Sequence, residues 1–95
     1  MTLETLTGKY IASAEKVMKE LQQTQTAITV TPENINNILN YVTNYLQDAK
    51  YYKAQKNLET SLTSIAYCEG LLDALKLLGA VKFEWPKNTK RKNES

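Results

Sequence analysis

Three segments of the chain repeat apolar residues at steps of three and four, and this spacing constrains the fold more than any other feature. Such steps place apolar side chains on one face of an α-helix. The first stripe consists of Leu3, Leu6, Tyr10, Ala14, Val17 and Leu21, the second of Ile35, Ile38, Leu39, Val42, Leu46 and Ala49, and the third of Leu58, Leu62, Ile65, Cys68, Leu72 and Leu75. Because single helices of this length are marginal in water, the stripes predict an all-α, up-down-up three-helix bundle.

The ends of the helices are marked by capping residues. Thr31 can cap a helix and Pro32 suits its first turn. Asn57 is the predicted cap or left-handed residue between the second and third helices, and Gly79 is the predicted stop of the third. The predicted domain is 1–80, with helices at about 3–25, 32–55 and 57–79.

The third predicted helix has features of a central element. A second apolar line of Tyr67, Leu71, Ala74 and Leu78 runs beside the first, which predicts contact with both other helices. Gly70 inside this helix predicts the close approach of another helix or an aromatic ring, since glycine there is otherwise unfavourable. Cys68 is predicted to be a small buried core residue.

After Gly79 the pattern changes to a period of two. Val81, Phe83 and Trp85 alternate with charged residues up to Pro86, which is typical of an extended segment. Residues 82–95 carry five basic and two acidic side chains, a net charge of +3, whereas the preceding residues carry seven and eight, a net charge of −1. The sequence predicts, over 81–95, an extended aromatic segment and a flexible basic tail.

Composition argues against an enzyme. The chain has no histidine and one cysteine, so it lacks the commonest general base, a disulfide and a thiolate zinc cluster. Glu69 and Asp73 share a helix face, as in half of a carboxylate metal site, but Lys76 on the same face favours a solvated charged stripe. We expect no catalytic residues, no metal site and no cofactor.

The sequence also lacks signals for export or membrane insertion. The N-terminus has no basic stretch before an apolar run, and the most apolar segment, Leu71 to Val81, is interrupted by two charges. That segment is far shorter than the roughly 20 residues that span a bilayer. We therefore expect a cytoplasmic protein that does not bind membranes, where a single reduced thiol is ordinary.

The second and third predicted helices resemble the archaeal domain-of-unknown-function 357 family. The matching residues are Asp48-Ala49-Lys50-Tyr51-Tyr52, Leu62, Tyr67-Cys68-Glu69-Gly70-Leu71-Leu72-Asp73-Ala74 and Gly79, with Ile28-Thr29-Val30-Thr31-Pro32 as the connector, so the resemblance covers about 28–79. This chain departs from the family's glycine–aspartate-like turn at Lys56-Asn57 and has Leu71 where an aromatic residue is common. The resemblance implies a short archaeal three-helix bundle. It implies no particular activity, because none is attached to the family.

Aromatic residues provide the candidate binding surface. Tyrosine is favoured at protein interfaces because it offers a large contact area at low entropic cost. Trp85 and Phe83 can dock on a partner or fold back over the end of the bundle. The predicted contact residues are Tyr41, Tyr45, Tyr52, Phe83 and Trp85. The first hypothesis is a non-catalytic interaction module, an accessory subunit of a larger complex, and a homodimer through the tyrosines is also open.

The basic tail provides a second hypothesis, a weak nucleic-acid-binding accessory factor. Its contact residues would be Lys87, Lys90, Arg91 and Lys92. Four cations release only a few counterions, so such binding would be weak and sensitive to salt. Without interleaved aromatic residues beyond Trp85, base readout is not expected. The alternative for this segment is a solubilising tail.

Overall fold

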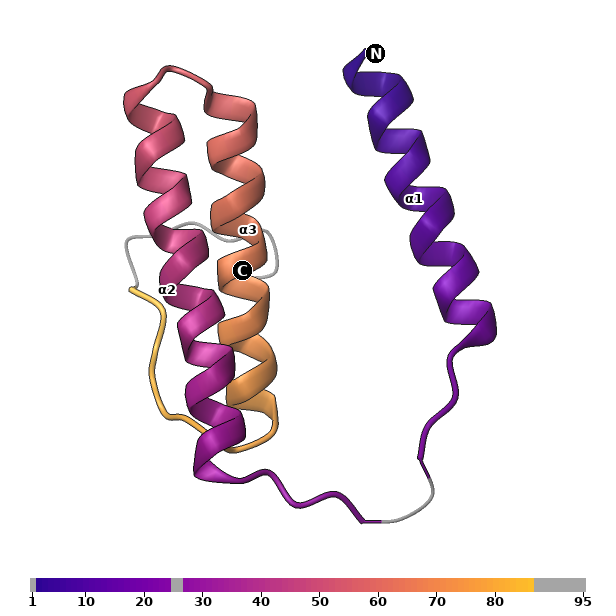
Figure 1. Ribbon diagram of the computed structural model, residues 1–95, viewed down its shortest axis with the longest axis vertical. Helices are drawn as coiled ribbons and strands as arrows, with labels where there is room; N and C mark the ends of the chain where they lie inside the picture. The colour runs from indigo at the N-terminus through magenta and orange to yellow at the C-terminus, as the bar shows by residue number, and fades with distance from the viewer. Residues whose placement is uncertain (1, 25–26, 87–95) are drawn as a thin grey trace.

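The computed structural model describes residues 2–24 and 27–86 of the chain. These residues form three helices, α1 (Leu3–Glu20), α2 (Pro32–Ala54) and α3 (Leu58–Leu77), and no strand lies within the described ranges. In Figure 1, α1 and α3 run in one direction and α2 in the other. The predicted all-α, three-helix, up-down-up fold is confirmed.

The start of α2 follows from three consecutive residues. The backbone N–H of Asn34 donates to Thr31 Oγ1 at 3.1 Å, and the Thr31 N–H donates to Asn34 Oδ1 at 3.2 Å. This reciprocal pair is a capping box, and Pro32 occupies the first helical turn. The predicted start at Thr31 and Pro32 is confirmed.

The turn between α2 and α3 gives Asn57 one of its two predicted roles, the cap, and gives the left-handed backbone to Lys56. Lys56, not Asn57, has the left-handed backbone, with φ of 66°. The N–H groups of Lys56 and Asn57 donate to the carbonyls of Lys53 and Tyr52, the pattern of a Schellman motif. Asn57 instead caps α3, because its side chain accepts from the Thr60 N–H at 3.4 Å.

The end of α3 repeats the same motif with the expected residue. Gly79 has φ of 78°, and the N–H groups of Gly79 and Ala80 donate to the carbonyls of Lys76 and Leu75. Glycine suits this position because it has no Cβ to oppose a left-handed backbone. The predicted stop at Gly79 is confirmed.

The core lies between α2 and α3. Two residues of α2, Val42 and Ala49, and three of α3, Ser64, Cys68 and Leu75, are buried. Ser61 Oγ donates to the Ala49 carbonyl at 2.6 Å, which joins the two helices near their connecting turn. In Figure 1, α2 and α3 lie side by side as a hairpin, and we call them the α2–α3 hairpin.

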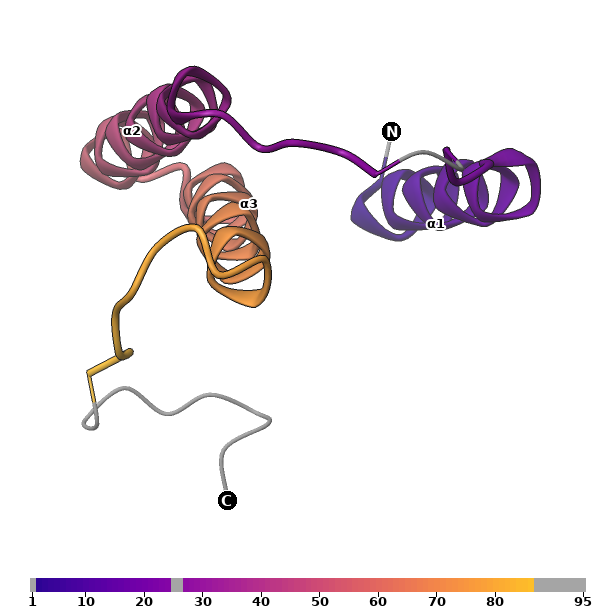
Figure 2. The same ribbon diagram turned by 90° about the horizontal axis from the view of Figure 1, so that it is seen from below.

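Helix α1 lies apart from this hairpin. No residue of α1 is buried, and every α1 Cα is more than 8 Å from every Cα of α2 and α3. Figures 1 and 2 show α1 to one side of α3, joined to α2 by the segment 21–31. The predicted contact of the third helix with both other helices is therefore absent, because α3 packs on α2 alone among the helices.

Helix α1 is also shorter than predicted. It ends at Glu20 rather than near residue 25, because Leu21 is extended, with ψ of 150°. The polar residues Gln22, Gln23 and Thr24 have no apolar side chain to pack against another helix, so a further helical turn would not be stabilised by burial.

Candidate protein-interaction surfaces

One side of the α2–α3 hairpin is built around stacked tyrosines. Tyr45 of α2 and Tyr67 of α3 have ring centroids 4.5 Å apart and an interplanar angle of 25°. Tyr41 and Tyr52 lie on the same stripe of α2 as Tyr45, since the three are spaced by whole helical turns. We call these four residues the tyrosine surface. Three of them, Tyr41, Tyr45 and Tyr52, are predicted contact residues, and they lie along one stripe of α2.

The exposure of the tyrosine surface is uneven. Tyr41 is 60% exposed, whereas Tyr45 and Tyr52 are half-buried. The Tyr52 ring meets the Tyr51 ring edge-on at 5.1 Å. A shallow recess of about 350 Å³ beside Tyr41 is lined by Asn37, Asn40 and Asn44. Tyr41 therefore offers an accessible aromatic ring next to amide groups.

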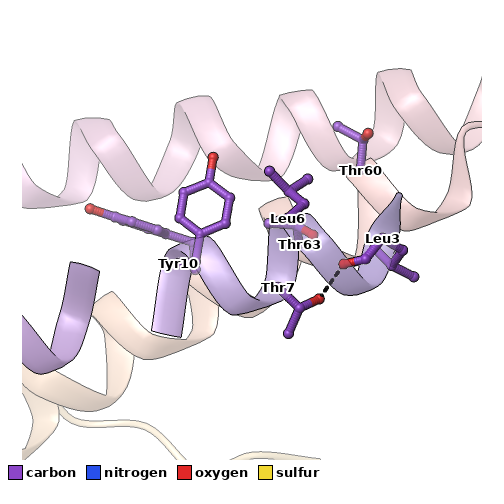
Figure 3. A pocket seen from close by; sticks show the side chains of 7 residues that line it. Leu3, Leu6, Thr7, Tyr10, Thr60 and Thr63 are labelled. Carbon is purple, nitrogen blue, oxygen red and sulfur yellow. Dashed lines mark hydrogen bonds between the residues drawn. The ribbon is translucent and has the colours of Figure 1, made fainter. Parts of the chain in front are cut away.

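A groove separates α1 from the tyrosine side of α3. It has a volume of about 580 Å³ and is lined by Leu3, Leu6, Thr7 and Tyr10 of α1 and by Thr60, Thr63 and Tyr67 of α3. Figure 3 draws side chains from both walls of this groove, among them Leu6 and Tyr10 of α1 and Thr60 of α3. The groove is thus walled by two helices of the same chain whose Cα atoms all lie more than 8 Å apart.

The segment 81–86 folds back on α3. Trp85 Nε1 donates to Asp73 Oδ1 at 2.8 Å, and the Trp85 ring meets the Phe83 ring edge-on at 5.0 Å. Lys76 Nζ lies 4.9 Å from the Phe83 ring centroid, within the range of a cation–π interaction. Phe83 and Trp85 are consequently half-buried against their own chain.

The aromatic residues occupy two opposite sides of the hairpin. Lys76 follows Tyr67 by nine residues, and at about 100° per residue the two side chains project from opposite faces of α3. Figures 1 and 2 agree, because the segment that follows α3 and α1 lie on opposite sides of the hairpin. Phe83 and Trp85 therefore do not share one surface with Tyr41, Tyr45 and Tyr52.

One carboxylate of α3 and one of the segment after it serve structural contacts. Asp73 accepts the Trp85 indole N–H, and Lys76 Nζ lies 3.9 Å from Glu84 Oε2. Within residues 2–24 and 27–86, no three histidine, cysteine, aspartate or glutamate side chains gather as a metal site would require. Cys68 lies in the core, where desolvation, and secondarily the charge of Glu69, raises the pKa of its thiol.

No helix among the described residues combines the length and the apolar character needed to span a membrane. The basic residues of the nucleic-acid hypothesis, Lys87, Lys90, Arg91 and Lys92, lie outside the described residues.

Comparison with known families gives a match over most of the chain. The model of the family described as protein of unknown function DUF357 matches residues 9–81. The chain belongs to the DUF357 family. No curated protein and no solved structure matches it significantly.

The DUF357 match covers more of the chain than the resemblance over about 28–79 in α2 and α3. It begins at Lys9, in the first half of α1, and continues to Val81. Most of α1 therefore belongs to the family pattern together with the α2–α3 hairpin. Phe83 and Trp85 follow the matched residues.

Sequence reasoning did not single out two features of these surfaces. Tyr67 was not among the predicted contact residues, although its place on the second apolar line of α3 is the signal that could have selected it. The bond from Trp85 to Asp73 has no signal in local spacing, because the turn at Gly79 and Ala80 decides where the following segment lies.

Proposed function

We propose that this DUF357 protein is a non-catalytic protein–protein interaction module, an accessory subunit of a larger cytoplasmic complex. Its primary contact surface is the tyrosine surface of the α2–α3 hairpin. Phe83 and Trp85 form a second contact region on the opposite side of α3.

One observation carries this proposal. A pair of stacked rings, Tyr45 and Tyr67, bridges two packed helices, and Tyr41 stands exposed one turn away. The stack fixes the ring positions before binding, so a partner loses little side-chain entropy on contact. Tyrosine rings on a rigid base are typical anchors of protein interfaces.

The chemistry of the chain supports a non-catalytic role. The sequence has no histidine, and its one cysteine is buried with a raised pKa, so the thiolate is disfavoured. Near the end of α3, the Asp73 carboxylate accepts a hydrogen bond from Trp85, and the Glu84 carboxylate pairs with Lys76.

Affinity capture from native extract tests the proposal with two matched tyrosine variants. Tyr41→Ser removes a ring that is 60% exposed on the tyrosine surface, and Tyr51→Ser removes one that is 58% exposed at a different helical angle. We expect Tyr41→Ser to lose a stoichiometric protein partner that Tyr51→Ser retains. Equal capture by both variants would refute the role of the tyrosine surface.

Two truncated chains separate the contributions of the C-terminal region. A chain ending at Pro86 retains Phe83 and Trp85 but lacks the basic residues, and a chain ending at Ala80 lacks both. Loss of the partner only in the shorter chain supports the second contact region. Capture that needs residues 87–95 and disappears after nuclease treatment would support the nucleic-acid hypothesis instead.

A further inference from the structure

The segment 81–86 has the shape of a β-strand that lacks a neighbouring strand. Its side chains at positions 81, 83 and 85 are half-buried, and those at positions 82, 84 and 86 are exposed. This alternation is typical of an extended chain with one face packed and the other in solvent. The packed face lies on α3, because Phe83 is next to Lys76 and Trp85 is bonded to Asp73.

The main chain of this segment is unpaired. Within residues 2–24 and 27–86, no hydrogen bond is made to the backbone N–H or carbonyl groups of 81–84. The preceding turn makes its last backbone bond at Ala80, whose N–H donates to the Leu75 carbonyl. A strand with free N–H and carbonyl groups along its edge is a template for another extended chain. Pro86 has no N–H and therefore limits the template to 81–85.

One side of the segment on α3 is open. Lys76 lies next to the Phe83 ring, and its neighbours Leu75 and Leu77 project about 100° to either side of it. Leu75 is 1% exposed in the α2–α3 core, whereas Leu77 is 88% exposed. A strand added on the Leu77 side would cover an apolar side chain that now faces solvent.

Gly70 lies on the same open side. It precedes Leu77 by about two helical turns and has nearly the same helical angle. Gly70 is exposed, and a Cβ added to it would meet no atom within 4 Å, so the predicted close approach at this glycine is not made among the described residues. Because glycine has no side chain, the backbone of an added strand can approach α3 closely there.

The outward side chains specify which strand fits. Lys82 and Glu84 are exposed and opposite in sign, and the Glu84 side chain is 92% exposed although it pairs with Lys76 at 3.9 Å. In antiparallel pairs, unlike charges directly opposite each other stabilise and like charges destabilise. A fitting strand therefore has a base opposite Glu84, an acid opposite Lys82 and apolar residues between and beside them. Read in its own direction, its order is apolar, basic, apolar, acidic, apolar.

The segment 81–85 has this order itself, but a second folded copy does not fit. Two antiparallel strands related by a two-fold axis turn their packed faces to the same side, so both α3 helices would lie against one face. The strands would be about 4.8 Å apart, whereas packed helices need about 8–10 Å between their axes. The partner strand must therefore have no helix beneath it.

We propose that residues 81–85 accept an extended segment of a partner protein as an antiparallel strand on the Leu77 side of α3. The main chain of 81–85 binds the partner strand, and the charges of Lys82 and Glu84 set its direction and register. This inference rests on the proposed second contact region of Phe83 and Trp85, and it names the form of the partner there.

A synthetic peptide with the sequence of residues 80–86 is the probe, because it has the required order and no helix beneath it. It is titrated into the ¹⁵N-labelled full chain and followed by NMR. We expect shifts of the backbone amides of 81–85 and of Leu77, while the Trp85 indole N–H stays protected from exchange by its bond to Asp73. No shifts at about 1 mM peptide would overturn the proposal. Loss of the indole protection would also overturn it, because the peptide would then displace the segment.

Exchange of lysine and glutamate in the peptide is the matched control. The composition is unchanged, but like charges now lie opposite each other. We expect the exchanged peptide to bind the native chain about tenfold more weakly, and the K82E/E84K chain to reverse this preference. K82E alone leaves the pair of Glu84 with Lys76 in place and is expected to abolish the preference. Equal binding of both peptides to the native chain, or the same preference in all three chains, would overturn the antiparallel register.

N-methylated peptides test the main-chain contact. In a paired strand, the N–H groups of alternate residues point to opposite edges, so only one set of peptide amides meets the protein. One peptide is methylated at the positions of 81 and 83, and the other at those of 82 and 84. We expect one of them to bind at least about tenfold more weakly and the other to bind nearly as well as the unmodified peptide. Similar effects of both methylations would overturn the strand pairing.

Partner capture separates this inference from the proposed function. Equal capture by the chains ending at Ala80 and at Pro86 would refute the second contact region, whereas the titration still decides whether 81–85 pairs with a strand. If the partner needs residues 81–86, we expect the 80–86 peptide to compete for it and the K82E/E84K chain to capture at least about tenfold less. A partner that needs these residues but is unaffected by the peptide would leave the contact region intact and refute strand pairing.

Discussion

Helices α1 and α3 have similar lengths but opposite relations between pattern and burial. Helix α1 separates apolar from charged residues clearly, yet none of its side chains is buried. Helix α3 is apolar over a wide arc, and it contacts α2 on one side and Trp85 and Phe83 on another. An amphipathic stripe indicates which face of a helix can pack against another element. The positions of the neighbouring elements determine whether that face is buried.

The difference has a thermodynamic consequence. Side chains of α3 that lie in the core contribute to the free energy of unfolding of the hairpin, while local interactions in α1 contribute little. Substitutions in the two helices are therefore expected to change the free energy of unfolding by different amounts.

The largest effect is expected at the centre of the α2–α3 core. Leu75 is 1% exposed and Leu77, two residues later in the same helix, is 88% exposed. We expect Leu75→Ala to lower the free energy of unfolding by about 2–4 kcal/mol and Leu77→Ala to change it by less than about 0.5 kcal/mol. Urea unfolding followed by circular dichroism measures both, and similar losses would contradict the assignment of the core.

A smaller loss is expected at the end of α3. Gly79 has φ of 78°, and an added Cβ would meet no atom within 4 Å, so only the backbone opposes a side chain. We expect Gly79→Ala to lower the free energy of unfolding by about 1 kcal/mol because alanine disfavours a left-handed backbone. The same urea unfolding experiment measures it. An unchanged midpoint would show that the Schellman motif is not maintained.

The contact of Trp85 on α3 is open to direct observation, since Trp85 is the only tryptophan. Asp73→Ala removes the acceptor of the indole N–H. We expect a stability loss of about 1 kcal/mol and a red shift of the tryptophan emission, as the ring becomes more hydrated. Asp73→Asn keeps an acceptor and is the control. Identical spectra for native, Ala and Asn chains would mean that the segment 81–86 is not held by this bond.

A gain in stability is expected at the turn before α3. Lys56 has φ of 66° in the same hydrogen-bond pattern that Gly79 makes. We expect Lys56→Gly to raise the free energy of unfolding by about 0.5 kcal/mol, because relief of the left-handed backbone exceeds the added entropy of the unfolded chain. A thermal shift upward in calorimetry checks the sign, and a downward shift would contradict it.

The smallest effect is expected in α1. Lys16 Nζ lies 3.1 Å from Glu20 Oε2, and both side chains are exposed. We expect Glu20→Gln to change the free energy of unfolding by less than about 0.5 kcal/mol, since exposed ion pairs one turn apart contribute little. A loss well above 1 kcal/mol in urea unfolding would contradict the small contribution of α1 to the free energy of unfolding.

Local spacing was enough to predict the helices and most of their ends. The steps of three and four located all three helices, Thr31 and Pro32 located the start of α2, and Gly79 located the end of α3. These features depend on residues within one or two turns of one another, so the sequence contains all that they need. The turn before α3 shows the limit, because the sequence left Asn57 open as a cap or a left-handed residue, and only the structure shows that it is the cap and that Lys56 is left-handed.

The candidate surfaces could be predicted only in part. Helical spacing placed Tyr41, Tyr45 and Tyr52 on one stripe, but it did not show that Tyr67 stacks on Tyr45 across the hairpin. Nor did it show that Phe83 and Trp85 lie on the side away from the tyrosines. Both depend on how separate segments are oriented, which no local pattern specifies.

An all-α chain of three amphipathic or apolar helices with defined caps could be predicted from local patterns alone, and those patterns contain no constellation typical of catalysis. The three-dimensional arrangement was needed to show that α2 and α3 form the packed unit and that α1 lies apart from it across an apolar groove. It was also needed to show that Trp85 donates a hydrogen bond to Asp73. The physical reason is that capping and helical periodicity act over a few residues. The pairing of faces is a balance of burial and chain entropy over the whole molecule.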